Sequence, residues 1–258
     1  MIVISLLFCV ESVVTYMKGL GTIINVIAIL AGSSLGILIK GGMKEKLQNI
    51  LVQACGLATL FIGISGTLQN MLVVTEEGIQ TQGTLLLICS LVLGGFVGEL
   101  IDIEAKLDRV GEKIKGLVKS KNDNRFVDGF VTASLVVCIG AMAVVGSIQD
   151  GLTGDYSMLL SKSILDFIIT IVFASTMGIG VMFSAVALGI YQGSITLLAV
   201  FIAPYMTDSM IASLSLVGSA LIFGVGVNLI WDKKVRVGNM LPALLVPVFY
   251  ELIIQALA

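Results

Sequence analysis

Two charged residues stand four positions apart inside an apolar stretch, and they are the residues best placed to do chemistry. Asp166 lies in the run 164–171, which is otherwise apolar, and Lys162 precedes it by one helical turn. An ionisable group deep within a membrane helix is costly and is by default a functional candidate. Asp166 and Lys162 are therefore candidates for ion or proton coupling. A structural ion pair that neutralises both charges explains them equally well.

Two glycine-rich segments carry the other polar candidates. Helices opened at such glycines would expose backbone groups to a ligand, as in secondary transporters. The alternative is that each Gly-x-x-x-Gly pair is a packing surface that lets two helix backbones approach closely. The candidate substrate-binding residues are Gly32, Ser33, Ser34 and Gly36 in the first segment and Gly189, Tyr191, Gln192 and Gly193 in the second.

Catalytic chemistry finds little support in the residue types. The chain has no histidine, which removes the commonest metal ligand and general base. The 4 cysteines lie singly in apolar runs without a C-x-x-C pair, as small packing residues do. No serine or cysteine stands beside a credible base. We therefore expect no catalytic residues, no metal and no cofactor, and a protein that is not an enzyme.

Composition identifies the elements that must position these residues. Of the 258 residues 57% are hydrophobic and 12% are charged, whereas about a quarter of a soluble domain is charged. The mean hydropathy is +1.07. We expect an all-α, polytopic transmembrane helical bundle whose partners are the lipid bilayer and a small solute or ion. The net charge of −2 indicates no nucleic-acid partner.

Apolar stretches long enough to cross a bilayer predict about eight spans. They cover residues 19–39, 50–68, 84–100, 130–148, 158–175, 177–203, 209–231 and 239–258. Most of the 15 basic residues fall in three short segments, 40–46, 106–125 and 233–236. Because basic loops stay cytoplasmic, we expect the chain near Lys44, Lys113 and Lys234 to be inside and the chain near Glu76 and Gly154 to be outside.

The connection after the third span and the N-terminal segment are interpreted separately. A cytoplasmic amphipathic helix is predicted at about 101–119, because apolar residues recur there at helical spacing and form a seam. The seam residues are Leu100, Ile103, Leu107, Val110, Ile114 and Leu117. That helix lies on the membrane or the bundle, or else joins two protomers into a homo-oligomer through a coiled-coil seam. Residues 1–16 are an N-terminal extension or a marginal helix, ahead of a single integral membrane domain over 17–258.

An inverted repeat relating spans one to three to spans six to eight is a further prediction. Such repeats are typical of secondary transporters. Chance similarity among glycine-rich apolar helices is the alternative. The matched residues are Ala28, Gly32 and Gly36 with Ala185, Gly189 and Gly193, then 60–64 with 221–225, and 99–101 with 251–253.

Several runs of the sequence carry a resemblance to a known family: 17–22, 98–104, 130–135, 138–143, 146–151, 162–166 and 191–193. These runs resemble the YqgA/YdfK-type family of bacterial inner-membrane proteins, a domain of unknown function 554. The resemblance covers residues 17–258 and implies a multi-pass protein of the bacterial plasma (inner) membrane and, at most, a transporter. It supplies neither a substrate nor a site.

Taken together, these features favour a membrane transport protein that moves an unidentified small solute or ion. The alternative is a scaffold or regulatory subunit of the membrane that transports nothing. The two differ in geometry, because transport requires Asp166, Gln192 and the Gly32 segment to face one another, whereas a scaffold disperses them into packing contacts.

Overall fold

The structure is a computed structural model that describes residues 18–40, 44–76, 78–118, 125–139, 141–231 and 235–257. The N-terminal segment 1–16, with its proposed marginal helix, lies outside the described residues. Helices make up nearly all of the described chain, and two short strands form a hairpin. The α-helices are α2 (Leu20–Lys40), α3 (Glu45–Met71), α4 (Thr84–Ile101), α5 (Ile103–Leu117), α6 (Phe126–Cys138), α7 (Ala141–Thr153), α8 (Ser157–Met177), α9 (Ser184–Leu197), α10 (Ala199–Ile202), α11 (Asp208–Trp231), α12 (Val237–Met240) and α13 (Leu245–Leu257). The strands are β1 (Leu72–Thr75) and β2 (Gly78–Thr81), and the 3-10 helices are η1 (Ile179–Phe183), η2 (Ala203–Tyr205) and η3 (Leu241–Leu244).

The prediction of an all-α bundle with about eight spans is confirmed. Among the described residues, 7 helical segments are long and apolar enough to cross a membrane, and α6 with α7 makes an eighth if that bent pair is one span. The fourth span is not the straight segment 130–148 that the sequence predicts. It bends by 62° between α6 and α7, because the backbone turns extended at Ile139 and the helix ends there.

The sixth span also departs from the prediction of one helix over 177–203. The chain leaves α8 at Gly178, whose φ of 91° favours a residue without a Cβ, and continues as η1 before α9 begins. Beyond Leu197 the path continues through α10 and η2. These breaks lie at the ends of α9 and leave its interior regular.

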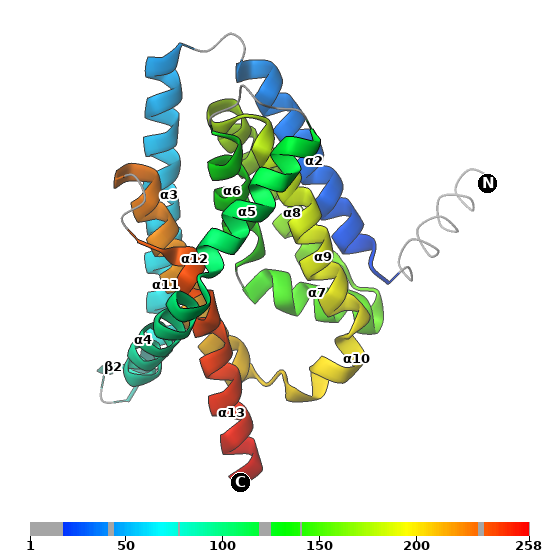
Figure 1. The fold of residues 1–258 in the computed structure, drawn as a ribbon. Helices are drawn as coiled ribbons and strands as arrows, with labels where there is room; N and C mark the ends of the chain where they lie inside the picture. The colour runs from blue at the N-terminus through cyan, green and yellow to red at the C-terminus, as the bar shows by residue number, and fades with distance from the viewer. Residues whose placement is uncertain are drawn as a thin grey trace, which may run out of the picture.

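Close helix pairs organise the bundle. α2 packs along α8, and α3 packs along α11, as Figure 1 shows. Glycines permit the second approach, since a Cβ at Gly63 would lie 2.5 Å from the Phe223 nitrogen and one at Gly226 would lie 2.7 Å from the Leu60 nitrogen. α4 packs against α12, η3 and α13. Small residues at helix crossings are the usual device by which helices associate inside a membrane.

The two ends of the bundle differ in charge. One end, called the basic end here, is where α3 and α6 begin, and it carries Lys44, Lys46 and Arg125 (Figure 1). The opposite end, called the acidic end, holds the β1–β2 hairpin and the start of α8, with Glu76 and Asp155. This separation is the one that the positive-inside rule uses.

Helix α6 lies between two apolar cores. One core joins α6 to α8, α11 and α12 and includes Phe173 and Val225. The other contains Ile29 of α2, Val137 of α6, and Leu188 with Ala185 of α9. Side chains of α6 therefore separate the α2–α9 side of the bundle from the α11 side.

Helix α5 occupies the position expected for the amphipathic helix. Asp102, with a φ of 52°, separates it from α4, so it begins a new direction. Its buried residue is Gly111, which packs on Val127 and Phe130 of α6, while Leu117 of the predicted seam is exposed. A seam between two protomers stays a prediction.

Candidate functional site

The Lys162 ammonium and the Asp166 carboxylate form an ion pair on one face of α8. Their side chains are 8% and 5% exposed, so the pair is enclosed by protein. The spacing of one helical turn accounts for the contact. Ion or proton coupling and structural neutralisation both remain compatible with this geometry.

Two amide side chains from other helices join this pair. Asn25 of α2 donates from Nδ2 to Oε1 of Gln192 on α9 over 3.4 Å, and both residues are 0% exposed. The side chain of Asn25 also lies close enough to the Asp166 carboxylate to interact with it. Asn25 therefore links the ion pair of α8 to α9. We call Asn25, Lys162, Asp166 and Gln192 the polar cluster.

Further side chains from α6 and α9 lie beside the polar cluster. The Cys138 thiol is close enough to Lys162 and Asp166 to interact with both charges. Tyr191 is half-buried and lies near Cys138. Among the predicted residues, the structure thus brings Asp166, Lys162 and Gln192 into one cluster, with Tyr191 at its edge. Asn25 was not a predicted site residue, although its position inside an apolar span was a usable signal.

The first glycine segment does not open as the sequence analysis expected. α2 runs without interruption through Gly32 and Gly36, and each glycine lies against the backbone of α8. A Cβ at Gly32 would be 2.5 Å from the Phe167 carbonyl oxygen, and one at Gly36 would overlap the Ile171 carbonyl oxygen. The close approach of two helices, which needs unbroken α2 backbone, explains this correction.

The two serines of that segment point in different directions. Ser34 is exposed and donates to the Leu30 carbonyl of its own helix over 2.7 Å, which removes it from the polar cluster. Ser33 is 0% exposed, and its hydroxyl has no hydrogen-bond partner. Only Ser33 therefore stays a candidate for contact with a solute.

The second glycine segment is continuous as well, because α9 runs from Ser184 to Leu197 without a break. It differs from the first segment in packing. A Cβ at Gly189 would lie 3.2 Å from a methyl carbon of Val26, and one at Gly193 would meet no atom within 4 Å. Neither glycine is required for a backbone contact as close as that of Gly32.

Asp150 is a structural anchor between α7 and α2. Its carboxylate, on α7, accepts the backbone N–H groups of Gly19 at 3.1 Å and of Gly21 at 3.0 Å. Those donors belong to the first turn of α2, where a helix leaves N–H groups without internal partners. A carboxylate there also interacts favourably with the helix dipole. Asp150 thus fixes α7 to the start of the helix that carries Asn25.

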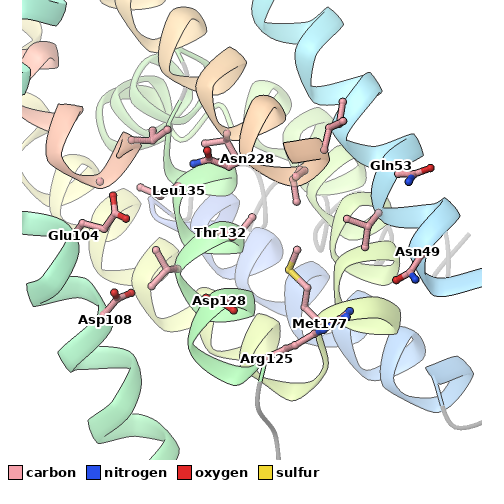
Figure 2. A pocket seen from close by; sticks show the side chains of 17 residues that line it. Asn49, Gln53, Glu104, Asp108, Arg125, Asp128, Thr132, Leu135, Met177 and Asn228 are labelled. Atoms are coloured by element: carbon pink, nitrogen blue, oxygen red, sulfur yellow. The ribbon is translucent and has the colours of Figure 1, made fainter. Parts of the chain in front are cut away.

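A cavity of about 700 Å³ opens near the basic end, apart from the polar cluster. Figure 2 shows Glu104 and Asp108 of α5 on one side and Asn49 and Gln53 of α3 on the other, with α6 between them. Its inner wall is apolar and includes Leu135, Met177 and Leu229. The polar lining residues are Asn49, Gln53, Glu104, Asp108, Arg125, Asp128, Thr132 and Asn228.

None of the predicted site residues lines this cavity. Thr132 and Leu135 face it, whereas Val137 of the same helix packs with Ile29 and Leu188. Asn228 is engaged in the turn between α11 and α12, where it donates to the Val235 carbonyl at 2.6 Å and accepts its N–H at 2.8 Å. No local pattern marks the cavity in the sequence, because its walls come from six helices distant in the chain.

Sequence comparisons find relatives along almost the whole chain. The model of the family described as "Protein of unknown function (DUF554)" matches residues 20–252. The chain is 34% identical over 236 residues to the uncharacterized membrane protein YdfK of Bacillus subtilis (strain 168), across 92% of this chain and 97% of that protein. It is 31% identical over 230 residues to the uncharacterized protein YqgA of Escherichia coli (strain K12), across 88% and 93% of the two chains. No solved structure matches.

Proposed function

This chain belongs to the DUF554 family, and we propose that it moves a small solute or ion across the bacterial plasma membrane. One observation carries the proposal: the polar cluster joins three helices inside apolar segments that are long enough to span a bilayer. Both matched relatives come from bacteria, and the one from Bacillus subtilis is described as a membrane protein.

The energetics of the polar cluster support a working site. A carboxylate and an ammonium removed from water each cost several kcal/mol, so an apolar pair of similar size would hold α8 at least as well. Ionisable residues inside membrane segments mark ion pathways and proton relays for this reason. A purely structural role would give no advantage that offsets the free-energy cost of burying the two charges.

The arrangement suggests how coupling would work. Lys162 and Asp166 neutralise each other in this conformation. A proton or cation that reaches Asp166 replaces the ammonium as its partner and releases Lys162. The exchange changes the surroundings of Asn25, because its amide lies beside the Asp166 carboxylate and is hydrogen-bonded to Gln192. Binding at α8 is thereby transmitted to the contact between α2 and α9.

The predicted inverted repeat is consistent with this function. The repeat would match α2 with α9, α3 with α11, and α4 with α12 and α13, and the members of each pair pack together. In repeat transporters the site lies where the two repeats meet. The unequal packing at the matched residues Gly36 and Gly193 shows that the two glycine segments are not equivalent in detail.

Flux through purified protein in liposomes tests the proposal. The panel covers protons, monovalent cations, halides, small organic anions and small neutral solutes. We expect flux of one member in the wild-type protein, and its loss in Asp166→Asn and Gln192→Leu at unchanged folding. Ser34→Ala is the matched control, because Ser34 is exposed and bonds only within α2, and it should retain full flux.

Two outcomes contradict the transport proposal. The first is that the wild-type protein moves no solute or ion of the panel, which would contradict transport itself. Retained flux in both Asp166→Asn and Gln192→Leu would instead place transport elsewhere in the chain. Gel-filtration profiles of each variant separate loss of function from loss of folding.

A scaffold that transports nothing is the second candidate, and one observation favours it. Gly32 and Gly36, expected near a substrate, pack against the backbone of α8 and leave no room for a ligand there. Under this function, Asp166→Asn would alter stability alone.

A further inference from the structure

Eight buried side-chain polar atoms of the described residues have no hydrogen-bond partner, and seven of them lie on three helices. Each such atom ordinarily costs about 1–3 kcal/mol, so a concentration of them calls for an explanation such as water or a ligand. α9 packs against both α2 and α6. The seven are on Thr22, Asn25 and Ser33 of α2, Ser134 of α6, and Ser184, Gln192 and Thr196 of α9, and the eighth is on Ser90 of α4.

The atoms on α2 and α9 are in register with one another. Asn25 is bonded to Gln192, and one helical turn farther along each helix Ile29 and Leu188 belong to the same apolar core. Residue numbers rise on α2 as they fall on α9, so the two helices run in opposite directions (Figure 1). The contact between them can therefore be followed turn by turn.

The next turn toward the basic end is polar again. Ser33 follows Ile29 on α2, and Ser184 precedes Leu188 on α9, each by four residues. Both serines are 0% exposed and without partners. The first turn toward the acidic end carries Thr22 and Thr196, whose hydroxyls are also without partners. From the acidic end to the basic end, the interface therefore has two polar levels, one apolar level and a third polar level.

We infer that the interface between α2 and α9 is a closed pathway for a small polar solute, and that Ile29 and Leu188 form its apolar closure. This inference rests on the proposed function and adds the route. Val137 of α6 completes the closure from the side. Apolar constrictions of this kind gate pores by excluding water.

The atoms without partners at the level of Asn25 and Gln192 define the class of solute. Asn25 Oδ1 lacks a donor and Gln192 Nε2 lacks an acceptor. An occupant must therefore donate and accept hydrogen bonds at once, as water and small hydroxyl or amide compounds do. A bare halide only accepts, and a bare metal cation does neither.

Cysteine accessibility tests the route without requiring flux. The full chain is freed of its own cysteines, and single cysteines are placed at Ser33, Ser184, Thr22 and Thr196. An impermeant methanethiosulfonate is then applied from each side. We expect the first two to react from the basic end and the last two from the acidic end, at least about tenfold faster than Ser90→Cys. Ser90 is 0% exposed, as Ser33 and Ser184 are, but lies on α4.

Opening the closure is the second arm. Ile29→Ala with Leu188→Ala should let the reagent reach the Thr22→Cys thiol from the basic end, which the parent closure prevents. Val225→Ala, a truncation in the other apolar core, is the matched control and should leave the Thr22→Cys thiol unreached from that side. Two positions sample the polar level at each end of the interface, so if one variant fails to fold, the other variant at that level gives the result.

The outcomes separate this inference from the proposed function. Cysteines at Ser33 and Ser184 that react no faster than Ser90→Cys overturn the pathway. Flux without labelling removes this route and keeps transport, whereas labelling without flux keeps a hydrated cleft and removes transport. Flux of halides alone, with labelling intact, overturns the assignment of solute class.

Discussion

Asp166 is bonded to Lys162 one turn earlier on α8, and the two side chains are 5% and 8% exposed. This relationship predicts compensation. Lys162→Met and Asp166→Leu should each destabilise the protein by about 3–5 kcal/mol, because each leaves a buried charge without a partner. The double variant should be at least as stable as the wild type, because two apolar side chains replace the pair. Thermal midpoints in one detergent provide the measurement.

An exposed ion pair of the same chain is the control for that cycle. Arg236 and Glu99 are 53% and 55% exposed, so Arg236→Met should cost less than about 1 kcal/mol. Additive losses in the Lys162 and Asp166 single and double variants would refute the buried pair as a unit.

Gly32 and Gly193 should respond oppositely to the same methyl group. Gly32→Ala should cost about 1–3 kcal/mol, since the new Cβ would lie 2.5 Å from the Phe167 carbonyl oxygen. Gly193→Ala should be neutral or stabilising by up to about 1 kcal/mol, because nothing lies within 4 Å and glycine weakens a helix interior. Equal thermal shifts in the two variants would contradict the packing of α2 on α8.

Asp150→Ala should destabilise the start of α2 by about 1–2 kcal/mol, as loss of a helix cap does. The carboxylate accepts from both Gly19 and Gly21, and Asn offers a single acceptor oxygen. Asp150→Asn should therefore fall between the wild type and Asp150→Ala. Hydrogen exchange of the first turn of α2 measures the effect, and unchanged protection in Asp150→Ala would disprove the anchor.

Asp155, outside the spans, predicts a pH dependence at the start of α8. Hydrogen bonds from the backbone and side chain of Ser157 hold the pKa of Asp155 below its ordinary value. Its contribution is therefore complete above that ordinary value and is lost as the pH falls through the lowered one. Thermal midpoints of the wild type and Asp155→Asn should converge at low pH. A difference that stays constant with pH would contradict the hydrogen bonding between Ser157 and Asp155.

Side-specific labelling tests the orientation of the bundle. Single cysteines at Lys46 and Lys113, exposed near the basic end, should react from the cytoplasm, and those at Glu76 and Asp155 from outside. All four positions are exposed, so access alone does not distinguish them. Labelling of the Glu76 and Lys113 positions from the same side would show that α4 does not cross the membrane.

The sequence by itself determined the properties that depend on neighbours along the chain. Hydropathy over about 20 residues is enough to place most spans, and the spacing of Lys162 and Asp166 is enough to pair them on α8. The bend after α6 was not predictable, because the 130–148 stretch is apolar throughout and hydropathy contains no information on a change of helix direction.

Only the tertiary structure decided which helices face one another. Asn25 and Gln192 are 167 residues apart, and nothing in either segment selects the other as its partner. Gly36 and Gly193 hold matched positions in the sequence, yet the first lies against the backbone of α8 and a Cβ at the second would meet no atom within 4 Å. Helix packing depends on complementary surfaces brought together from distant parts of the chain. The polar cluster, the Asp150 anchor and the cavity near α5 therefore form only when several helices distant in sequence pack together.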